Sequence, residues 1–87
     1  MVRQKTTIRN LTGLTMRSAE IFCKTAMQFP CKVTFQYENV TSNAKSLLSV
    51  LGACVKNGDE IELVCEGEEE QFALESMVKV IQDGLGE

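Results

Sequence analysis

One segment limits the possible fold more than any other feature of the chain. Between residues 60 and 66, the apolar residues Ile61, Leu63 and Cys65 alternate with glutamates at positions 60, 62 and 66. A period of two residues is typical of a β-strand with one face in a core and the other in solvent. The sequence therefore predicts a sheet with one open face, whose other face needs an apolar cover.

The other segments carry either this strand period or the period of an amphipathic helix. Strands are expected at 2–8, 33–37 and 40–42, and helices at 17–29, 47–52 and 68–85. Pro30 ends the first helix, and Gly52 closes the short second one. The order strand, helix, strand, strand, helix, strand, helix predicts an α+β fold, in which helices cover one face of a four-stranded antiparallel sheet.

Length and charge narrow the class of protein. No linker, repeat or low-complexity tract interrupts residues 1–87, so we expect a single domain. Nine basic and twelve acidic residues give a net charge of −3, which argues against direct binding of nucleic acid or an anionic membrane. The chain has no apolar run of membrane-spanning length and no signal-peptide segment, so we expect a cytoplasmic protein. We also expect a monomer.

The cysteines and the missing histidine argue against metal chemistry and catalysis. None of the four cysteines forms a C-x-x-C pair, and the chain has no histidine; the cysteines are Cys23, Cys31, Cys54 and Cys65. Zinc sites usually use such close pairs, so we interpret the cysteines as small, reduced apolar residues and predict no metal and no cofactor. No acid–base pair is visible either, so we do not expect an enzyme.

Three short motifs follow one another along the chain. Residues 13–19 read Gly-Leu-Thr-Met-Arg-Ser-Ala, residues 43–48 read Asn-Ala-Lys-Ser-Leu-Leu, and residues 67–70 read Gly-Glu-Glu-Glu. In this order and spacing they resemble the signatures of the HPr family, the histidine-containing phosphocarriers of the bacterial sugar phosphotransferase system. The resemblance covers essentially the whole chain and implies the family's open-faced sandwich, βαββαβα, with three helices on one face of the sheet.

The first motif departs from the family at its centre. The resemblance places Thr15 where family members carry the phosphorylated histidine, and Ser18 where a proline follows the arginine. A threonine phosphate is an ester of low transfer potential, so Thr15 cannot act as a reversible relay. We therefore predict that the phosphocarrier activity is lost. Threonine is also a good helix N-cap, and this is the role we expect for Thr15.

Arg17 and Ser46 are the functional residues that the resemblance leaves in place. In the family, the arginine neutralises the phosphorylated histidine and contacts partners that recognise a serine-phosphorylated form; the alternative is a solvated helix arginine. Ser46 stands at an expected helix start, where a phosphate meets free N–H groups and the positive end of the helix dipole. The alternative is a serine N-cap that no kinase modifies.

The resemblance also implies a surface around this serine that binds phosphate or partner proteins. Its residues are Lys45, Leu47, Leu48 and Leu51. The alternative is that some of the leucines belong to the core, because a short helix needs tertiary packing. The partners that the resemblance implies are HPr kinase/phosphorylase, a LacI-type transcriptional regulator and the enzymes of the phosphotransferase system.

Our leading hypothesis is a regulatory, histidine-lacking family member that acts through Ser46 phosphorylation in carbon catabolite control. Two alternatives stay open. The first is a phosphocarrier with another acceptor, such as Cys23 or Cys54. The second is an unphosphorylated decoy or scaffold that binds enzymes of the phosphotransferase system.

Overall fold

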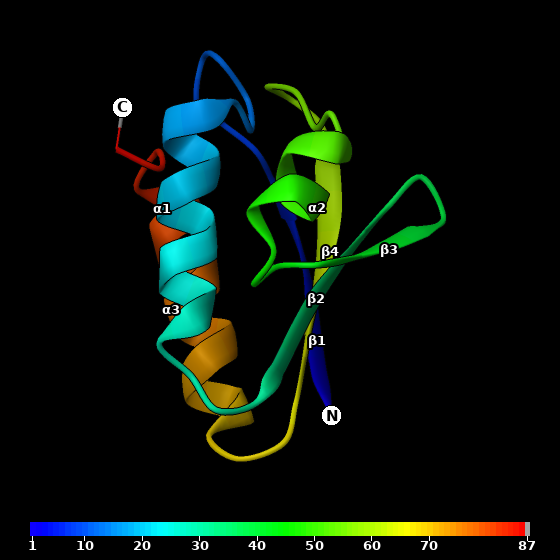
Figure 1. The fold of residues 1–87 in the computed structure, drawn as a ribbon, viewed down its shortest axis with the longest axis vertical. Coiled ribbons are helices and arrows are strands. Elements are labelled where there is room, and N and C mark those ends of the chain that lie inside the picture. The colour runs from blue at the N-terminus through cyan, green and yellow to red at the C-terminus, as the bar shows by residue number, and fades with distance from the viewer. Residues whose placement is uncertain (87) are drawn as a thin grey trace.

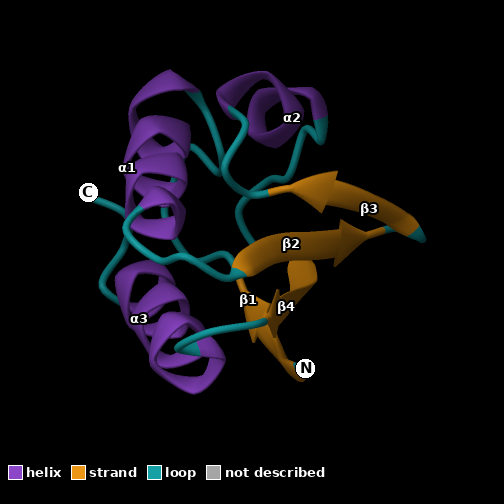
Figure 2. Ribbon diagram, turned by 60° about the horizontal axis from the view of Figure 1, so that its bottom comes forward, coloured by secondary structure: helices purple, strands orange, loops and turns teal. Residues whose placement is uncertain are grey.

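The computed structural model describes residues 1–86 and confirms the predicted order of elements (Figure 1). The elements are β1 (Val2–Thr7), α1 (Met16–Met27), β2 (Lys32–Tyr37), β3 (Val40–Asn43), α2 (Leu47–Gly52), β4 (Glu60–Glu66) and α3 (Glu70–Gln82). The four strands form one antiparallel sheet in the order β1-β4-β2-β3. Figure 2 shows the helices gathered on one side of this sheet. The predicted α+β open-faced sandwich is therefore confirmed.

The alternating segment forms β4, which lies between β1 and β2 in the sheet. Ile61, Leu63 and Cys65 face the helices and are at most 1% exposed. On the open face, the carboxylate of Glu62 lies 3.6 Å from the guanidinium of Arg3 on β1. The period of two thus reflects a strand with one buried and one solvated face, as the sequence predicts.

Two helical stripes cover the inner face of the sheet. The apolar residues at helical spacing on α1 are buried; they are Ala19, Phe22, Cys23 and Ala26. The Phe22 ring meets the Phe35 ring of β2 edge to face, with centroids 5.3 Å apart. The buried residues of α3 are Ala73, Leu74, Met77, Val78 and Ile81. Because these side chains and the sheet share one core cluster, the loops that join the elements are held at fixed positions.

The ends of α3 differ from the expected 68–85. The helix begins at Glu70, because Glu69 takes a left-handed backbone conformation with φ +62°. It ends at Gln82, and Leu85 follows with φ +52°. Leu85 nevertheless is fully buried, so it extends the apolar stripe through a left-handed turn and not through a longer helix.

A hydrogen bond joins the β2–β3 hairpin to the turn before β4. The Tyr37 hydroxyl donates to Asp59 Oδ2 at 2.6 Å, and the same oxygen accepts from the Lys56 N–H at 2.9 Å. The bond to Asp59 raises the pKa of the Tyr37 phenol above its ordinary value. The bond from Tyr37, followed by that from Lys56, lowers the pKa of Asp59.

These shifts predict how the Tyr37–Asp59 contact responds to pH. Because the pKa of Asp59 is lower in the folded than in the unfolded chain, its carboxylate stabilises the fold at pH values above the unfolded pKa of about 4. This stabilisation is lost as the pH falls through the folded pKa. Because the pKa of the Tyr37 phenol is higher in the folded than in the unfolded chain, the protonated phenol stabilises the fold below about pH 10, and this stabilisation is lost as the pH rises further. Tyr37→Phe is therefore expected to lower the urea midpoint most at neutral pH and least at both extremes. An equal difference at every pH would contradict the assigned charge states.

Candidate functional site

The loop before α1 is held tightly against the loop before β4. Gly13 has φ +68°, and a Cβ added to it would lie 2.6 Å from the Val55 carbonyl oxygen and 2.7 Å from Lys56 Cα. The Leu14 N–H donates to the same Val55 oxygen at 2.9 Å, and Asn10 Nδ2 donates to the Gly13 oxygen at 2.7 Å. Because only glycine fits this approach, the position of the α1 N-terminus depends on Gly13.

Thr15 is the N-cap of α1, as the sequence predicts. Its backbone is extended, with φ −102° and ψ −175°, and its carbonyl accepts from the Ala19 N–H at 2.7 Å. The exposed Thr15 hydroxyl donates to Thr12 Oγ1 at 3.3 Å. It faces the Ser18 N–H in the arrangement of a capping box but makes no strict side-chain cap bond. The N-cap position is thus confirmed, and the Thr15 side chain meets the Ser18 N–H in a capping box without the geometry of a strict hydrogen bond.

Ser18 completes this arrangement from the first turn of α1. Its fully buried hydroxyl oxygen accepts from the Thr15 N–H at 3.0 Å and donates to the Gly13 carbonyl at 2.5 Å. The sequence analysis noted Ser18 only as a departure from the family motif. A polar residue three positions after a threonine cap is the signal that would have indicated this role.

Arg17 is exposed on the first turn of α1, close to Gly86. The Met16, Arg17 and Ser18 N–H groups precede the first intrahelical bond, which Ala19 makes, so this turn carries the partial positive charge of the helix end. A Cβ added to Gly86 would lie 2.5 Å from Ile21 Cδ1 and 3.9 Å from Arg17 Nε. The end of the described chain therefore packs along α1 (Figure 1).

Ser46 is the N-cap of α2. Its backbone is extended, its Oγ accepts from the Ser49 N–H at 3.3 Å, and its carbonyl accepts from the Val50 N–H at 3.0 Å. The side chain is only partly buried. The expected helix start is confirmed, and the hydroxyl lies where it satisfies one free N–H group of the helix.

Lys45 has a contact that the sequence did not predict. Its Nζ donates to the carbonyl oxygen of Phe29 at 2.6 Å, and its N–H donates to Asn43 Oδ1 at 2.9 Å. The first bond joins the segment before α2 to the loop that follows α1. Lys45 therefore anchors the Ser46 segment to that loop.

The three leucines of α2 differ in burial. Leu48 is 84% exposed, while Leu47 and Leu51 are partly buried and pack against the core. Leu48 is therefore accessible on the surface, whereas Leu47 and Leu51 also support the helix. Together with exposed apolar residues before and along α1, they form what we term the α1–α2 apolar surface. Its members are Leu11, Met16, Met27, Leu47, Leu48 and Leu51.

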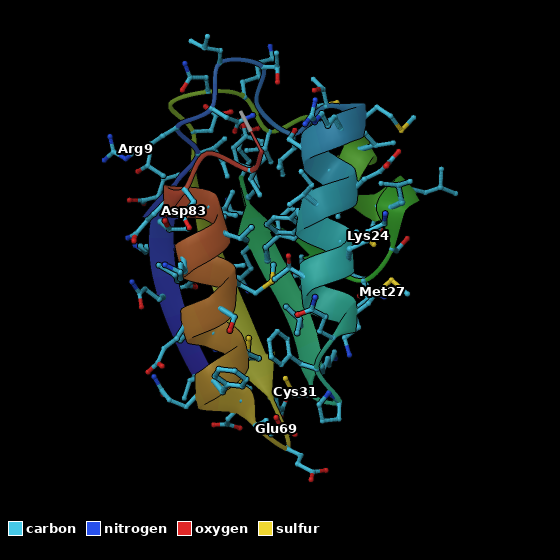
Figure 3. The ribbon with its side chains drawn as sticks, turned by 90° about the vertical axis from the view of Figure 1, so that its left-hand side faces the viewer. Arg9, Lys24, Met27, Cys31, Glu69 and Asp83 are labelled. Atoms are coloured by element: carbon cyan, nitrogen blue, oxygen red, sulfur yellow. The ribbon has the colours of Figure 1, made fainter. Side chains whose placement is uncertain are left out.

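Two grooves run along this surface. One, of about 770 Å³, is lined by residues that include Thr15, Met16, Leu51 and Cys54. The other, of about 310 Å³, lies between α1 and α2 and is lined by Glu20, Cys23, Lys24, Met27 and Leu47. In Figure 3, Lys24 and Met27 lie on the side of α1 that faces α2. The first groove brings Thr15 and the α2 leucine Leu51 together, but its lining does not include Arg17.

Within residues 1–86 the side chains form no metal-binding cluster and no helix is suited to span a membrane. Cys23, Cys31 and Cys65 are buried, as expected for small apolar residues, but Cys54 is exposed. The described side chains include no group of three or more His, Cys, Asp or Glu residues placed to hold a metal ion. Among the same residues, none of the helices has the length and apolar character needed to cross a membrane.

Comparison with known proteins agrees with this geometry. The family model of the PTS HPr component phosphorylation site matches residues 2–83. The chain belongs to the HPr family. Crh, an HPr-like protein of Bacillus subtilis, is 36% identical over 95% of this chain and 98% of its own length. The phosphocarrier protein HPr of Treponema pallidum is 30% identical over 100% of this chain and 99% of its own length.

Solved structures of HPr-family proteins share the fold. The crystal structure of HPr-C-His from Thermoanaerobacter tengcongensis has a TM-score of 0.97 and 32% identity, and the match covers 100% of this chain and 98% of that one. A crystal structure of Bacillus subtilis Crh, described as a dimer with a swapped domain, has a TM-score of 0.77 and 36% identity over 97% of both chains. The open-faced sandwich is thus the HPr fold. The phosphocarrier proteins of this family carry a phosphoryl group and are not themselves catalysts.

Proposed function

We propose that this HPr-family protein is a cytoplasmic regulator that has lost histidine phosphocarrier activity and acts through phosphorylation of Ser46. The observation that carries the proposal is a contrast between two helix starts. Thr15 caps α1 in a chain without histidine, whereas Ser46 caps α2 with its hydroxyl partly accessible. Bacillus subtilis Crh, which is 35% identical in its solution structure, is named a catabolite repression HPr, and this supports a role in carbon catabolite control.

The loss of the relay follows from the chemistry at Thr15. A carrier must accept and release a phosphoryl group, and a phosphorylated imidazole does both because its N–P bond has a high transfer potential. The Thr15 hydroxyl would form a phosphate ester, which does not pass its phosphoryl group on readily. The α1 N-terminus keeps Arg17 and the N–H groups that precede the first intrahelical bond, so the missing group in our proposal is the acceptor.

Phosphorylation of Ser46 would change a defined contact. A phosphate adds about −1.5 to −2 charges and three acceptor oxygens. The Oγ atom now accepts from the Ser49 N–H at 3.3 Å, a bond that the phosphate oxygens can strengthen. The added charge lies directly before Leu47 and Leu48 on the α1–α2 apolar surface, so a partner would meet an anion beside an exposed apolar patch.

This arrangement suits a partner that recognises both features. Leu48 offers apolar area, and Arg17 on α1 adds a planar cation that suits pairing with phosphate or carboxylate. We propose HPr kinase/phosphorylase as the modifying enzyme and a LacI-type transcriptional regulator as the reader. We propose that the chain does this as a monomer.

Incubation with HPr kinase/phosphorylase and ATP tests the proposal. We expect one phosphate per chain on Ser46, located by mass spectrometry, and none in Ser46→Ala. Ser49→Ala is the matched control, because Ser49 lies one turn later on α2, and it should be labelled fully. An unlabelled wild-type chain beside a labelled HPr from a low-GC Gram-positive bacterium would overturn the proposal.

The two alternatives give other results. Transfer of a labile phosphoryl group from enzyme I to Cys23 or Cys54 would support a carrier with a thiol acceptor. Cys54 is the exposed one of the two and lines the groove beside Thr15. Capture of phosphotransferase-system enzymes that Ser46→Ala leaves unchanged would instead support a scaffold.

A further inference from the structure

Two buried thiols lie near one another where β2 begins and β4 ends. Cys65 of β4 is opposite Val33 of β2, so Cys31, two residues before Val33, lies diagonal to it. Both side chains face the core, with 2% of Cys31 and none of Cys65 exposed. Figure 3 shows Cys31 beside the loop that carries Glu69, where β4 has ended. The sheet register therefore places the two sulfur atoms in one buried neighbourhood.

The surroundings of the two thiols support this closeness. Burial raises the pKa of the Cys65 thiol to about 11, with a further contribution from the neighbouring Cys31 thiol. A Cβ added to Gly67 would lie 3.4 Å from both Cα and Cβ of Cys31, so the end of β4 packs closely against this residue. The other two cysteines lie elsewhere: Cys23 Sγ is 3.8 Å from Met27 Sδ on α1, and Cys54 is exposed after α2.

We propose that Cys31 and Cys65 form a redox pair that a two-electron oxidant, hydrogen peroxide, converts to a disulfide. Peroxide oxidises one thiol to a sulfenic acid and releases one water. The second sulfur then attacks the oxidised sulfur, the S–O bond breaks, and the departing oxygen leaves as a second water with the proton of the second thiol. Two thiols are thus oxidised, and one peroxide is reduced to two waters.

The backbone at Cys31 allows this bond to close. Diagonal neighbours in an antiparallel sheet lie about 7–8 Å apart at Cα, whereas disulfides span about 4.4–6.8 Å. Cys31 precedes β2 and lies in the loop after α1, so a shift of about 1 Å does not break the pairing of the strand. Because both thiols are buried, we expect closure to be slow and to require transient opening of this loop.

Redox titration of the full chain tests the proposal. A Cys23→Ala/Cys54→Ser variant retains only the two proposed thiols and is equilibrated in glutathione redox buffers, starting from reduced protein and from protein oxidised with hydrogen peroxide. The samples are then unfolded and alkylated, and we expect the two alkylatable thiols to be lost together as the buffer becomes more oxidising. Before alkylation, the mass of the intact oxidised protein should be lower than that of the reduced protein by two hydrogen atoms. A linked peptide should contain Cys31 and Cys65, and the melting temperature should rise by roughly 10 °C until dithiothreitol reverses it.

The control is the same variant with Cys31→Ala added, in which Cys65 should stay fully alkylatable. Three outcomes would overturn the proposal: two alkylatable thiols at the oxidising limit from both starting states, glutathione on a single cysteine, or dimers linked between chains. None of these outcomes depends on Ser46, so the redox pair and the proposed function are tested separately.

Discussion

Replacing Thr15 by histidine is expected to give a chain that enzyme I phosphorylates with phosphoenolpyruvate. The wild type should take up no label, and Thr15→His should approach one phosphoryl group per chain. The reason is that the N-cap position already has extended backbone, the N–H groups that precede the first intrahelical bond, and Arg17 beside it. An imidazole there supplies the phosphoryl acceptor that, in our proposal, position 15 lacks.

Acid lability separates the two phosphorylation sites. A phosphohistidine is lost in acid, whereas a phosphoserine survives, so the label on Thr15→His should disappear on mild acid treatment. Thr15→Ser is the matched control, because it keeps a hydroxyl N-cap without an imidazole, and it should remain unlabelled. If Thr15→His stayed unlabelled beside a labelled HPr, a missing acceptor would not explain the absence of phosphorylation, and the surroundings would be the cause, first of all Ser18 at the family's proline position.

Gly13→Ala is expected to lower the free energy of unfolding by about 2–5 kcal/mol, since it combines left-handed strain with a backbone clash. The added Cβ would meet the Val55 oxygen at 2.6 Å and Lys56 Cα at 2.7 Å, and backbone atoms cannot rotate away as a side chain does. Urea unfolding measures the change. Because the same loop positions Thr15, we also expect weaker partner binding at temperatures where the variant is still folded.

Two other glycines separate the causes of this effect. Gly58 has φ +93° but no atom within 4 Å of an added Cβ, so Gly58→Ala should show strain alone, about 1 kcal/mol. At Gly52 the added Cβ is also unobstructed and the backbone is helical, so Gly52→Ala should raise stability by up to about 1 kcal/mol. Equal losses at Gly13 and Gly58 would show that the contact with Val55 and Lys56 is not the cause.

The fold was predictable because burial imposes a period on each element. The alternation at 60–66 and the α1 stripe ending at Ala26 both follow from one apolar face against one core. The end of α3 was predicted wrongly for a related reason. Leu85 continues the apolar stripe and is buried, but it reaches the core with a left-handed backbone after the helix has ended. The apolar pattern of the sequence does not distinguish a longer helix from such a turn.

The candidate site was predictable only where its signals are local. A serine before a short apolar run indicates an N-cap, and Ser46 is one. The contacts of Lys45 with Phe29 and of Tyr37 with Asp59 join residues that are 16 and 22 positions apart, respectively. A local sequence pattern does not predict contacts at such separations. Ser18 lies between these cases, because its spacing from Thr15 was visible but its buried bond to Gly13 was not.

The two ends of the chain offer unequal places for experimental tags. Gly86 packs on Ile21 and lies close to Arg17. A purification tag or fluorophore fused next to it would therefore obstruct the part of α1 to which we propose that a partner binds. The Met1 amine instead pairs with Glu70 at 3.0 Å, at the other end of the molecule in Figure 1. Immobilisation through the N-terminus would therefore leave α1 and α2 free for binding measurements, at the loss of one solvent-exposed ion pair.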